Sequence, residues 1–274
     1  VHEKIGIYDK PVWGEGAAML LGADIDLRIF PKTWAFGFAV ERQDGDETRR
    51  SLQFFDSSGE AVHKLHLRPA SDVAAYEALV AELLHDDQSD RIAVEPAVAS
   101  TRVAAEVERK ALRDRWQGRS DVHQFPALLR DFKLTRHEAV RGVGDDIAWM
   151  LDPAAATEVL HRAAARSVPI MCFVGSRGCI QIHSGPVRDI RPMGPWINVL
   201  DETFHLHLRT DHNSEVWAVR KPVKEGHVTS VEAYGADGEL IIQFFGERKE
   251  GRAEREDWRV LSESLPRIAR TSAA

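Results

Sequence analysis

The feature that most constrains the fold of this 274-residue chain is an internal repeat. Residues 2–28 resemble residues 183–209 at an offset of 181, without a gap. Shorter matches continue to residue 265 at offsets of 179 to 182, as expected where loops differ in length. Self-similarity over such a distance indicates a duplicated folding unit. The sequence therefore predicts two tandem copies of one structural repeat.

Each copy is expected to be an antiparallel meander sheet with flanking helices. Alternating apolar and polar residues predict the strands, and apolar residues at helical spacing predict the helices. In the first copy the strands are residues 25–30, 34–41, 50–55 and 61–67, and the helix is 73–84; in the second copy they are 216–221, 228–234 and 239–245, with a helix at 258–265. The fold class is therefore α+β.

A helical region is predicted between the two meanders. Ser120 can cap a helix over 121–131, Thr135 and Glu138 form a capping box for a helix to about residue 150, and Pro153 suits the start of a helix over 154–165. We expect a first repeat over 1–100, and linking helices plus a second repeat over 101–274. Nothing comparable to this region precedes the first copy, which we therefore expect to be N-terminally truncated.

Composition limits the classes of partner. The formal net charge is −7, which argues against a general nucleic-acid binder or a protein of anionic membrane surfaces. No apolar run approaches the roughly 18 residues of a membrane-spanning helix, so no membrane insertion is expected. Cys172 and Cys179 are the only cysteines, too few for a disulfide framework, and we expect them in a core hairpin of a cytoplasmic protein.

The chain has no common catalytic motif. A glycine-rich phosphate loop, H-E-x-x-H and G-x-S-x-G are all missing from the sequence. His205 and His207 have the most metal-like spacing, because alternate residues of a strand share one face. No third ligand is apparent there, so a polar sheet face is favoured over a metal site.

Several short motifs together resemble the HemS/ChuS/PhuS family of bacterial cytoplasmic haem-utilisation proteins, described as haemin-degrading factors or haem chaperones. The motifs are Asp121-Val-His123-Gln-Phe125, Ile25-Asp-Leu-Arg28-Ile-Phe30, Val174-Gly-Ser-Arg-Gly-Cys-Ile-Gln181, Arg220-Lys221-Pro222 and Gln243-Phe-Phe-Gly246. The resemblance extends over essentially the whole chain, in order. It implies that haem, as ligand or substrate, lies in a cleft between the two copies.

The resemblance also implies roles for individual residues. His123 corresponds to the haem iron ligand, and Arg28 to a distal arginine with a catalytic role. The residues expected to bind haem are Arg28, Phe30, Arg136, Lys221, Gln243, Phe245 and Arg248. Pro126 stands where relatives commonly have a second aromatic residue. An imidazole in the first turn of a helix favours the neutral form that ligates iron, and cations can pair with the haem propionates.

Three functions remain open at the level of sequence. The first is a haem-degrading oxygenase activity that needs an external electron donor, because the sequence has no flavin or nicotinamide fingerprint. The second is a non-catalytic chaperone that receives haem, for instance from a haem ABC transporter, and delivers it to a separate haem oxygenase. The third is haem storage. All three require the same pocket, so the residues do not separate them.

Overall fold

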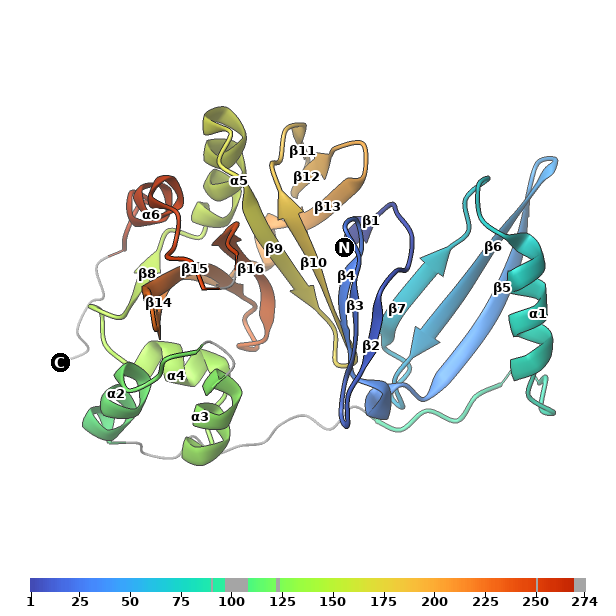
Figure 1. Ribbon diagram of the computed structural model, residues 1–274, viewed down its shortest axis with the longest axis horizontal. Helices are drawn as coiled ribbons and strands as arrows, with labels where there is room; N and C mark the ends of the chain where they lie inside the picture. Colours follow the sequence, from blue (N-terminus) through green and yellow to red (C-terminus); the bar gives the residue numbers. More distant parts are fainter. Residues whose placement is uncertain (90, 97–107, 122–123, 250, 269–274) are drawn as a thin grey trace.

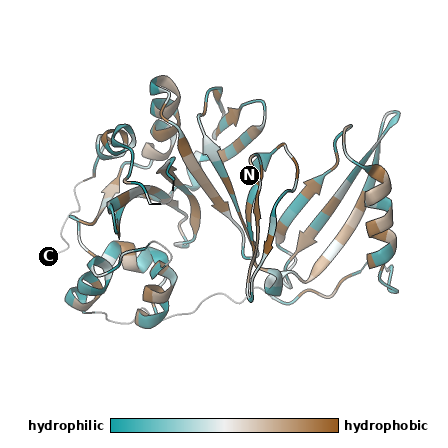
Figure 2. Cartoon of the chain, viewed as in Figure 1, coloured by the Kyte–Doolittle hydropathy of each residue, from teal (hydrophilic) through white to brown (hydrophobic). Residues whose placement is uncertain are grey.

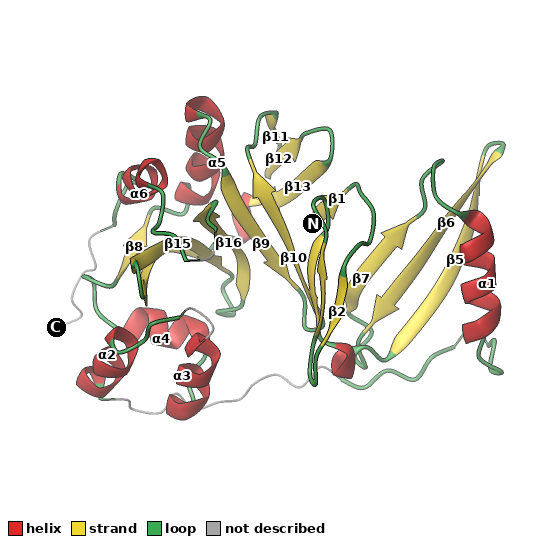
Figure 3. Ribbon diagram, in the orientation of Figure 1, coloured by secondary structure: helices red, strands yellow, loops and turns green. Residues whose placement is uncertain are grey.

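A computed structural model describes residues 1–89, 91–96, 108–121, 124–249 and 251–268, arranged in three antiparallel sheets and six α-helices (Figures 1 and 3). The largest sheet has nine strands in the order β2 (Pro11–Trp13), β3 (Ala18–Leu21), β4 (Asp26–Ile29), β10 (Cys179–Gly185), β9 (Ile170–Gly175), β16 (Leu240–Gly246), β15 (Gly226–Tyr234), β14 (Glu215–Val223) and β8 (Ala148–Leu151). The α+β class predicted from the sequence is confirmed.

Two smaller sheets and the helices complete the fold. The four-stranded sheet has the order β1 (His2–Lys4), β13 (Phe204–Arg209), β12 (Trp196–Leu200) and β11 (Ile190–Met193), and the three-stranded sheet is β5 (Phe36–Asp44), β6 (Glu47–Phe55) and β7 (Ala61–His66). The helices are α1 (Val73–Leu83), α2 (Arg109–Gln117), α3 (Phe125–Phe132), α4 (Arg136–Gly142), α5 (Ala155–Arg166) and α6 (Glu256–Glu263).

The strand registers repeat with an offset of 179. Phe36 lies opposite Phe55 in the first hairpin, and Glu215 lies opposite Tyr234 in the second. Even the register irregularity of β6–β7 after Phe54 recurs in β15–β16. The same offset relates β2–β3–β4 to β11–β12–β13. The offset of 181 expected for residues 2–28 is therefore wrong by two residues, because an ungapped sequence match does not determine which residues of two strands are structurally equivalent.

The two copies exchange strands rather than forming separate sheets. β1 of the first copy pairs with β13 of the second, and β10 of the second pairs with β4 of the first. These two pairings are equivalent, since adding 179 to the first-copy residue of each pairing gives the second-copy residue of the other: His2 corresponds to Gln181, and Leu27 to Leu206. β9 joins β10 to β16 in the large sheet, whereas the part of the chain that the structure describes has no strand joining β1 to β7 in the same way. The expected division near residue 100 falls in 97–107, outside the described residues.

The core lies on both faces of the large sheet. Helices α5 and α6 cover one face, whose buried residues include Leu160, Phe244 and Trp258. Helices α2, α3 and α4 lie across the other face near β14 and β15 (Figure 1). Cys172 and Cys179 are buried on adjacent strands and unbonded to each other, as predicted. By contrast, few side chains of β5–β7 are buried, although these strands contain hydrophobic as well as hydrophilic residues (Figure 2).

Helix boundaries in the linking region differ from the prediction. The capping box of Thr135 and Glu138 is present, but α4 ends at Gly142 rather than near residue 150. Gly144 has a φ of +107°, which turns the chain out of the helix and into β8. Helix α3 begins at Phe125 instead of Asp121. Helix α2 was not predicted, because charged residues dominate it.

Candidate functional site

Four of the eight predicted site residues lie on one face of the nine-stranded sheet. Arg28 lies opposite Ile180 on β10, and Ile182, two residues further on, lies opposite Phe173 on β9. Phe173 in turn lies opposite Gln243 on β16. Directly opposed residues of antiparallel strands point to the same side, as do residues two apart. We call this side the Arg28 face.

The Arg28 face continues across β15 and β14. Gln243 lies opposite Glu232, and Phe245 lies opposite Ser230. On β14, Lys221 lies on the same side, two residues beyond Val219, which lies opposite Ser230. Parts of the chain that are far apart in sequence therefore contribute Arg28, Gln243, Phe245 and Lys221 to one surface.

This face is covered at one end and partly open at the other. Near β14 and β15 it packs against α2, α3 and α4 in a buried cluster that includes Trp116, Phe125 and Trp217. On β9 and β16, Phe173 and Phe245 are only half-buried, and their ring centroids are 5.2 Å apart. An apolar, aromatic surface thus remains accessible beside the covered end.

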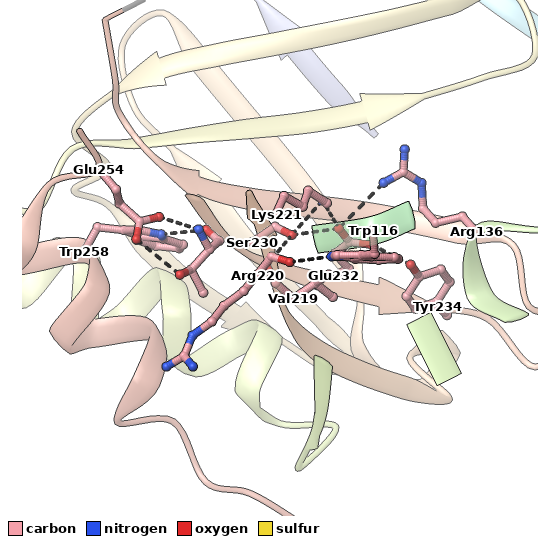
Figure 4. Close-up of polar contacts among 11 residues, drawn as sticks. Trp116, Arg136, Val219, Arg220, Lys221, Ser230, Glu232, Tyr234, Glu254 and Trp258 are labelled. Carbon is pink, nitrogen blue, oxygen red and sulfur yellow. Dashed lines mark hydrogen bonds and ion pairs between the residues drawn. The ribbon is translucent and has the colours of Figure 1, made fainter. Parts of the chain in front are cut away.

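A buried ionic network lies at the boundary between these two parts (Figure 4). The Lys221 ammonium donates to Ser230 Oγ at 2.8 Å and to a carboxylate oxygen of Glu232. The Tyr234 hydroxyl donates to the other oxygen of that carboxylate, Oε2. Arg136 Nη1 lies 3.7 Å from Oε1, the oxygen that Lys221 contacts. Lys221 and Glu232 are 3% and 0% exposed, so their charges interact with little screening by water.

Burial shapes the ionisation of both groups. Burial lowers the pKa of Lys221 to about 8, although the neighbouring Glu232 carboxylate opposes the shift. Burial disfavours the Glu232 carboxylate as well, but the Lys221 and Arg136 cations and two hydrogen bonds hold its pKa at about 2. Glu232 is therefore ionised at neutral pH and pairs with the Lys221 ammonium.

Three cations surround the ring of Phe125. The guanidinium carbons of Arg119 and Arg136 lie 4.8 Å and 4.7 Å from its centroid, and the Lys221 nitrogen lies 5.7 Å away. Lys221 also lies 4.9 Å from the Phe245 centroid, which links the cations to the accessible aromatic surface. The site therefore combines an apolar plane with positive charge at one edge.

Arg28 occupies the opposite end of this face. Its guanidinium donates to the Asp26 carboxylate and, at 3.2 Å, to the carbonyl oxygen of Leu27. The side chain is 30% exposed, so Arg28 is neither buried in the core nor fully solvated. Burial raises the pKa of Asp26, although Arg28 acts against the shift. Phe30 follows β4 and is half-buried, with its amide donating to the Gly178 carbonyl.

The remaining predicted residues lie elsewhere or outside the described chain. His123 lies outside the described residues. Arg248 follows β16 and lines a separate basic hollow with Lys249, Arg252 and Arg255. Among the described residues, no contact joins Arg248 to Lys221 or Arg136. His205 and His207 contact Glu3 and Asn198, and the described residues contain no cluster of three metal-ligating side chains.

Sequence reasoning missed several members of the site. They are Arg119, Phe125, Phe173, Ser230, Glu232 and Tyr234. One signal was available for Glu232, because a carboxylate that lies between the apolar residues Val231 and Ala233 of a strand needs a buried cation. Arg119 and Phe173 carry no comparable signal, since their surroundings come from distant parts of the chain.

Comparison with known proteins assigns the family. A family model described as the haemin-degrading HemS.ChuX domain matches residues 1–83 and 133–265. The hemin transport protein HmuS of Yersinia pestis is 38% identical over 260 residues, which is 94% of this chain and 75% of the relative. The helices among the described residues include none long and apolar enough to cross a membrane.

Solved structures agree with this assignment. Holo-PhuS, a heme-binding protein from Pseudomonas aeruginosa, superimposes with a TM-score of 0.93 at 43% identity, covering 97% of this chain and 78% of that one. The heme-degrading enzyme ChuS from Escherichia coli O157:H7 gives a TM-score of 0.88 at 34% identity, with the same coverage of both chains.

Proposed function

The chain belongs to the haemin-degrading HemS/ChuX family, and we propose that it binds haem against the Arg28 face and opens the porphyrin oxidatively to release iron during haem utilisation. We propose that the protein performs this function in the cytoplasm. A second candidate, delivery of intact haem to a separate haem oxygenase, is favoured by the similarity to a hemin transport protein. Both functions begin with the same binding step.

The observation that carries the proposal is the pairing of an accessible aromatic surface with buried cations. Phe173 and Phe245 offer an apolar surface, and Lys221 and Arg136 lie at its edge. Haem is a flat apolar ring with two carboxylates on one edge. Apolar contact would hold the ring, and the cations would neutralise the carboxylates. Gln243 Nε2, buried without a partner among the described residues, supplies a further donor.

We propose that His123 would ligate the haem iron. The family resemblance supports this role, and Phe125, two residues further along, contacts the cations of the site. A neutral imidazole is a suitable donor to haem iron. Arg28 would then act on the opposite side of the ring as a donor-only side chain. Phe30 would pack beside it, and Arg248 would contribute positive charge outside the ionic network.

Haem when bound supplies the redox chemistry at its iron. The chain would bind and orient the ring, exclude water from the aromatic surface and present the Arg28 guanidinium. Ring opening consumes dioxygen and electrons, so the reaction needs an external reductant. For the carrier function, a haem ABC transporter and a haem oxygenase are the proposed partners.

The ligand assignment is tested by titrating haem into wild-type protein and His123→Ala. We expect the variant to lose the Soret band of the complex, or to need a much higher haem concentration to form it. His161→Ala is the matched control, because His161 is exposed on α5 and should leave the titration unchanged. An unaltered Soret band and affinity in His123→Ala would remove the assignment.

The fate of haem is tested with loaded protein, an electron donor, oxygen and catalase, which removes stray peroxide. Loss of the Soret band with one defined cleaved product is expected for the degrading function. A stable spectrum, combined with rapid transfer to apo haem oxygenase, would contradict degradation and support the carrier.

A further inference from the structure

Arg119 is a buried cation for which the described residues provide no acidic partner. It follows α2 and is 5% exposed. Its Nε donates to the carbonyl oxygen of Trp116 at 3.1 Å, and its guanidinium carbon lies 4.7 Å from the Trp116 ring centroid. Both terminal nitrogens, Nη1 and Nη2, are buried without a hydrogen-bond partner among the described residues. A planar fork of donors is therefore held in place, and no described residue accepts a hydrogen bond from its two terminal nitrogens.

The surroundings of Arg119 increase this imbalance. Its guanidinium packs against the Phe125 ring, which Arg136 and Lys221 also contact. The Glu232 carboxylate contacts Arg136 and Lys221. Burial, together with the charges of Arg136 and Arg115, lowers the pKa of Arg119 to about 10. Arg119 is still charged at neutral pH. An uncompensated charge away from water costs several kcal/mol in general, so its presence needs a compensating interaction.

We propose that Arg119 completes a carboxylate-binding subsite with Arg136 and Lys221, and that this subsite selects ligands with a free carboxylate at the edge of an apolar ring. The inference rests on the proposed function and adds a residue that determines specificity. The guanidinium fork suits a planar carboxylate, because two parallel N–H donors match its two oxygens. Glu232 alone cannot neutralise all three cations, so an incoming carboxylate restores the balance of charge.

Packing alone is a weaker explanation for Arg119. Its stem lies against Trp116 and Phe125, where an uncharged chain of similar length would fill the same space. One hydrogen bond to a carbonyl satisfies only one of the guanidinium nitrogens. A purely structural role would therefore predict loss of stability on substitution, whereas a binding role predicts loss of carboxylate selectivity without loss of stability.

The test compares metal-free protoporphyrin IX with its dimethyl ester, which keeps the ring but lacks free carboxylates. Binding is followed by porphyrin fluorescence, which needs no iron ligand. We expect wild-type protein to prefer the free acid, and Arg119→Gln to reduce that preference by about ten- to a hundredfold, the effect of a hydrogen bond to a charged group. Affinity for the ester should change little. Arg119→Lys, which keeps the charge but loses the fork, should retain part of the preference.

Arg115→Gln is the matched control. It removes one positive charge from α2, but Arg115 is exposed and paired with Asp131 at 3.1 Å. We expect this control to keep the wild-type preference. We also expect ligand-free Arg119→Gln to unfold thermally at a temperature no lower than wild type.

Three results would overturn the inference. An unchanged free-acid preference in Arg119→Gln would remove the subsite while leaving haem binding intact. Equal losses for acid and ester, with a lower unfolding temperature, would assign Arg119 to structure alone. If wild-type protein bound neither porphyrin nor haem, the proposed function would fail as well, and that outcome is distinct from the first two.

Discussion

At the scale of single residues, the balance of charge around Glu232 is the central feature of the site. Its carboxylate accepts hydrogen bonds from Lys221, Ser230 and Tyr234 while it is wholly buried. Such a network is stable only when every member has a partner. Removing the carboxylate would leave Lys221 and Arg136 as further uncompensated cations beside Arg119.

We predict that Glu232→Gln lowers the free energy of unfolding at pH 7 by roughly 3 kcal/mol, because breaking a buried ion pair leaves its partner charged and unpaired. The measurement is urea denaturation of ligand-free protein. Glu225→Gln, in the exposed turn between β14 and β15, is the control and should change little. A Glu232→Gln protein as stable as wild type would show that the pair contributes no net stability.

The same pair predicts a dependence of stability on pH. The pKa of Glu232 is about 2 in the folded protein, below its usual value of 4.5. The stabilisation is therefore fully present above about pH 4.5 and is lost as the pH falls towards 2. We expect Glu232→Gln to show a shallower loss of stability than wild type between these values. Parallel profiles for the two proteins would contradict this assignment.

Arg28 has a different kind of role, which rests on the proposed haem complex. We predict that Arg28→Ala changes the absorption spectrum of the ferric complex more than it changes haem affinity, because the side chain would act on the distal side. Arg49→Ala is the control, because Arg49 is an exposed residue of β6 paired with Asp44. An identical ferric spectrum in Arg28→Ala would count against a distal position.

At the scale of elements, the tip of the β9–β10 hairpin fastens the second copy to the first. The Gly178 carbonyl accepts hydrogen bonds from the Trp34 indole at 2.8 Å and from the Phe30 amide at 2.9 Å. A Cβ atom on Gly178 would lie 2.7 Å or less from atoms of Thr33, Trp34 and Val62. This close approach explains the glycine at the junction.

We predict that Gly178→Ala destabilises the protein by about 1–3 kcal/mol, the usual cost of overpacking. Thermal denaturation measures the effect. Gly16→Ala is the matched control, since a Cβ there meets nothing within 4 Å and the backbone has no positive φ. If both variants melted at the same temperature as wild type, the hairpin tip would not be a tight junction.

At the scale of the whole molecule, two meanders with the same register have very different environments. Strand β15 is buried along almost its full length, whereas no residue of β5 is buried. Opening free energy depends on burial as well as on hydrogen bonds. The two meanders therefore share the same hairpin geometry and differ in how deeply their side chains are buried.

We predict that backbone amides of β14–β16 exchange with deuterium at least about tenfold more slowly than equivalent amides of β5–β7. Hydrogen exchange with mass spectrometry measures this in one sample, and each pair of positions related by 179 is its own control. Equal protection of the two meanders would mean that the whole chain opens only in a single cooperative step.

The sequence alone determined the repeat and the α+β class, and it selected four of the residues that lie on the Arg28 face. These features follow from local patterns, because strand alternation, capping boxes and short family motifs are written in adjacent residues. Arg28, Lys221, Gln243 and Phe245 could be chosen this way, and the structure places them on one surface.

Only the tertiary structure decided the offset of 179, the exchange of β1 and β10, and the charge balance around Glu232 and Arg119. The offset and the strand exchange depend on which distant strands pair, and the charge balance depends on how deeply each charged group is buried. Residues that are adjacent in sequence determine neither of these. The sequence does not show whether an arginine side chain is exposed or buried. The Arg119 guanidinium is buried because it packs against the rings of Trp116 and Phe125, which exclude water from it.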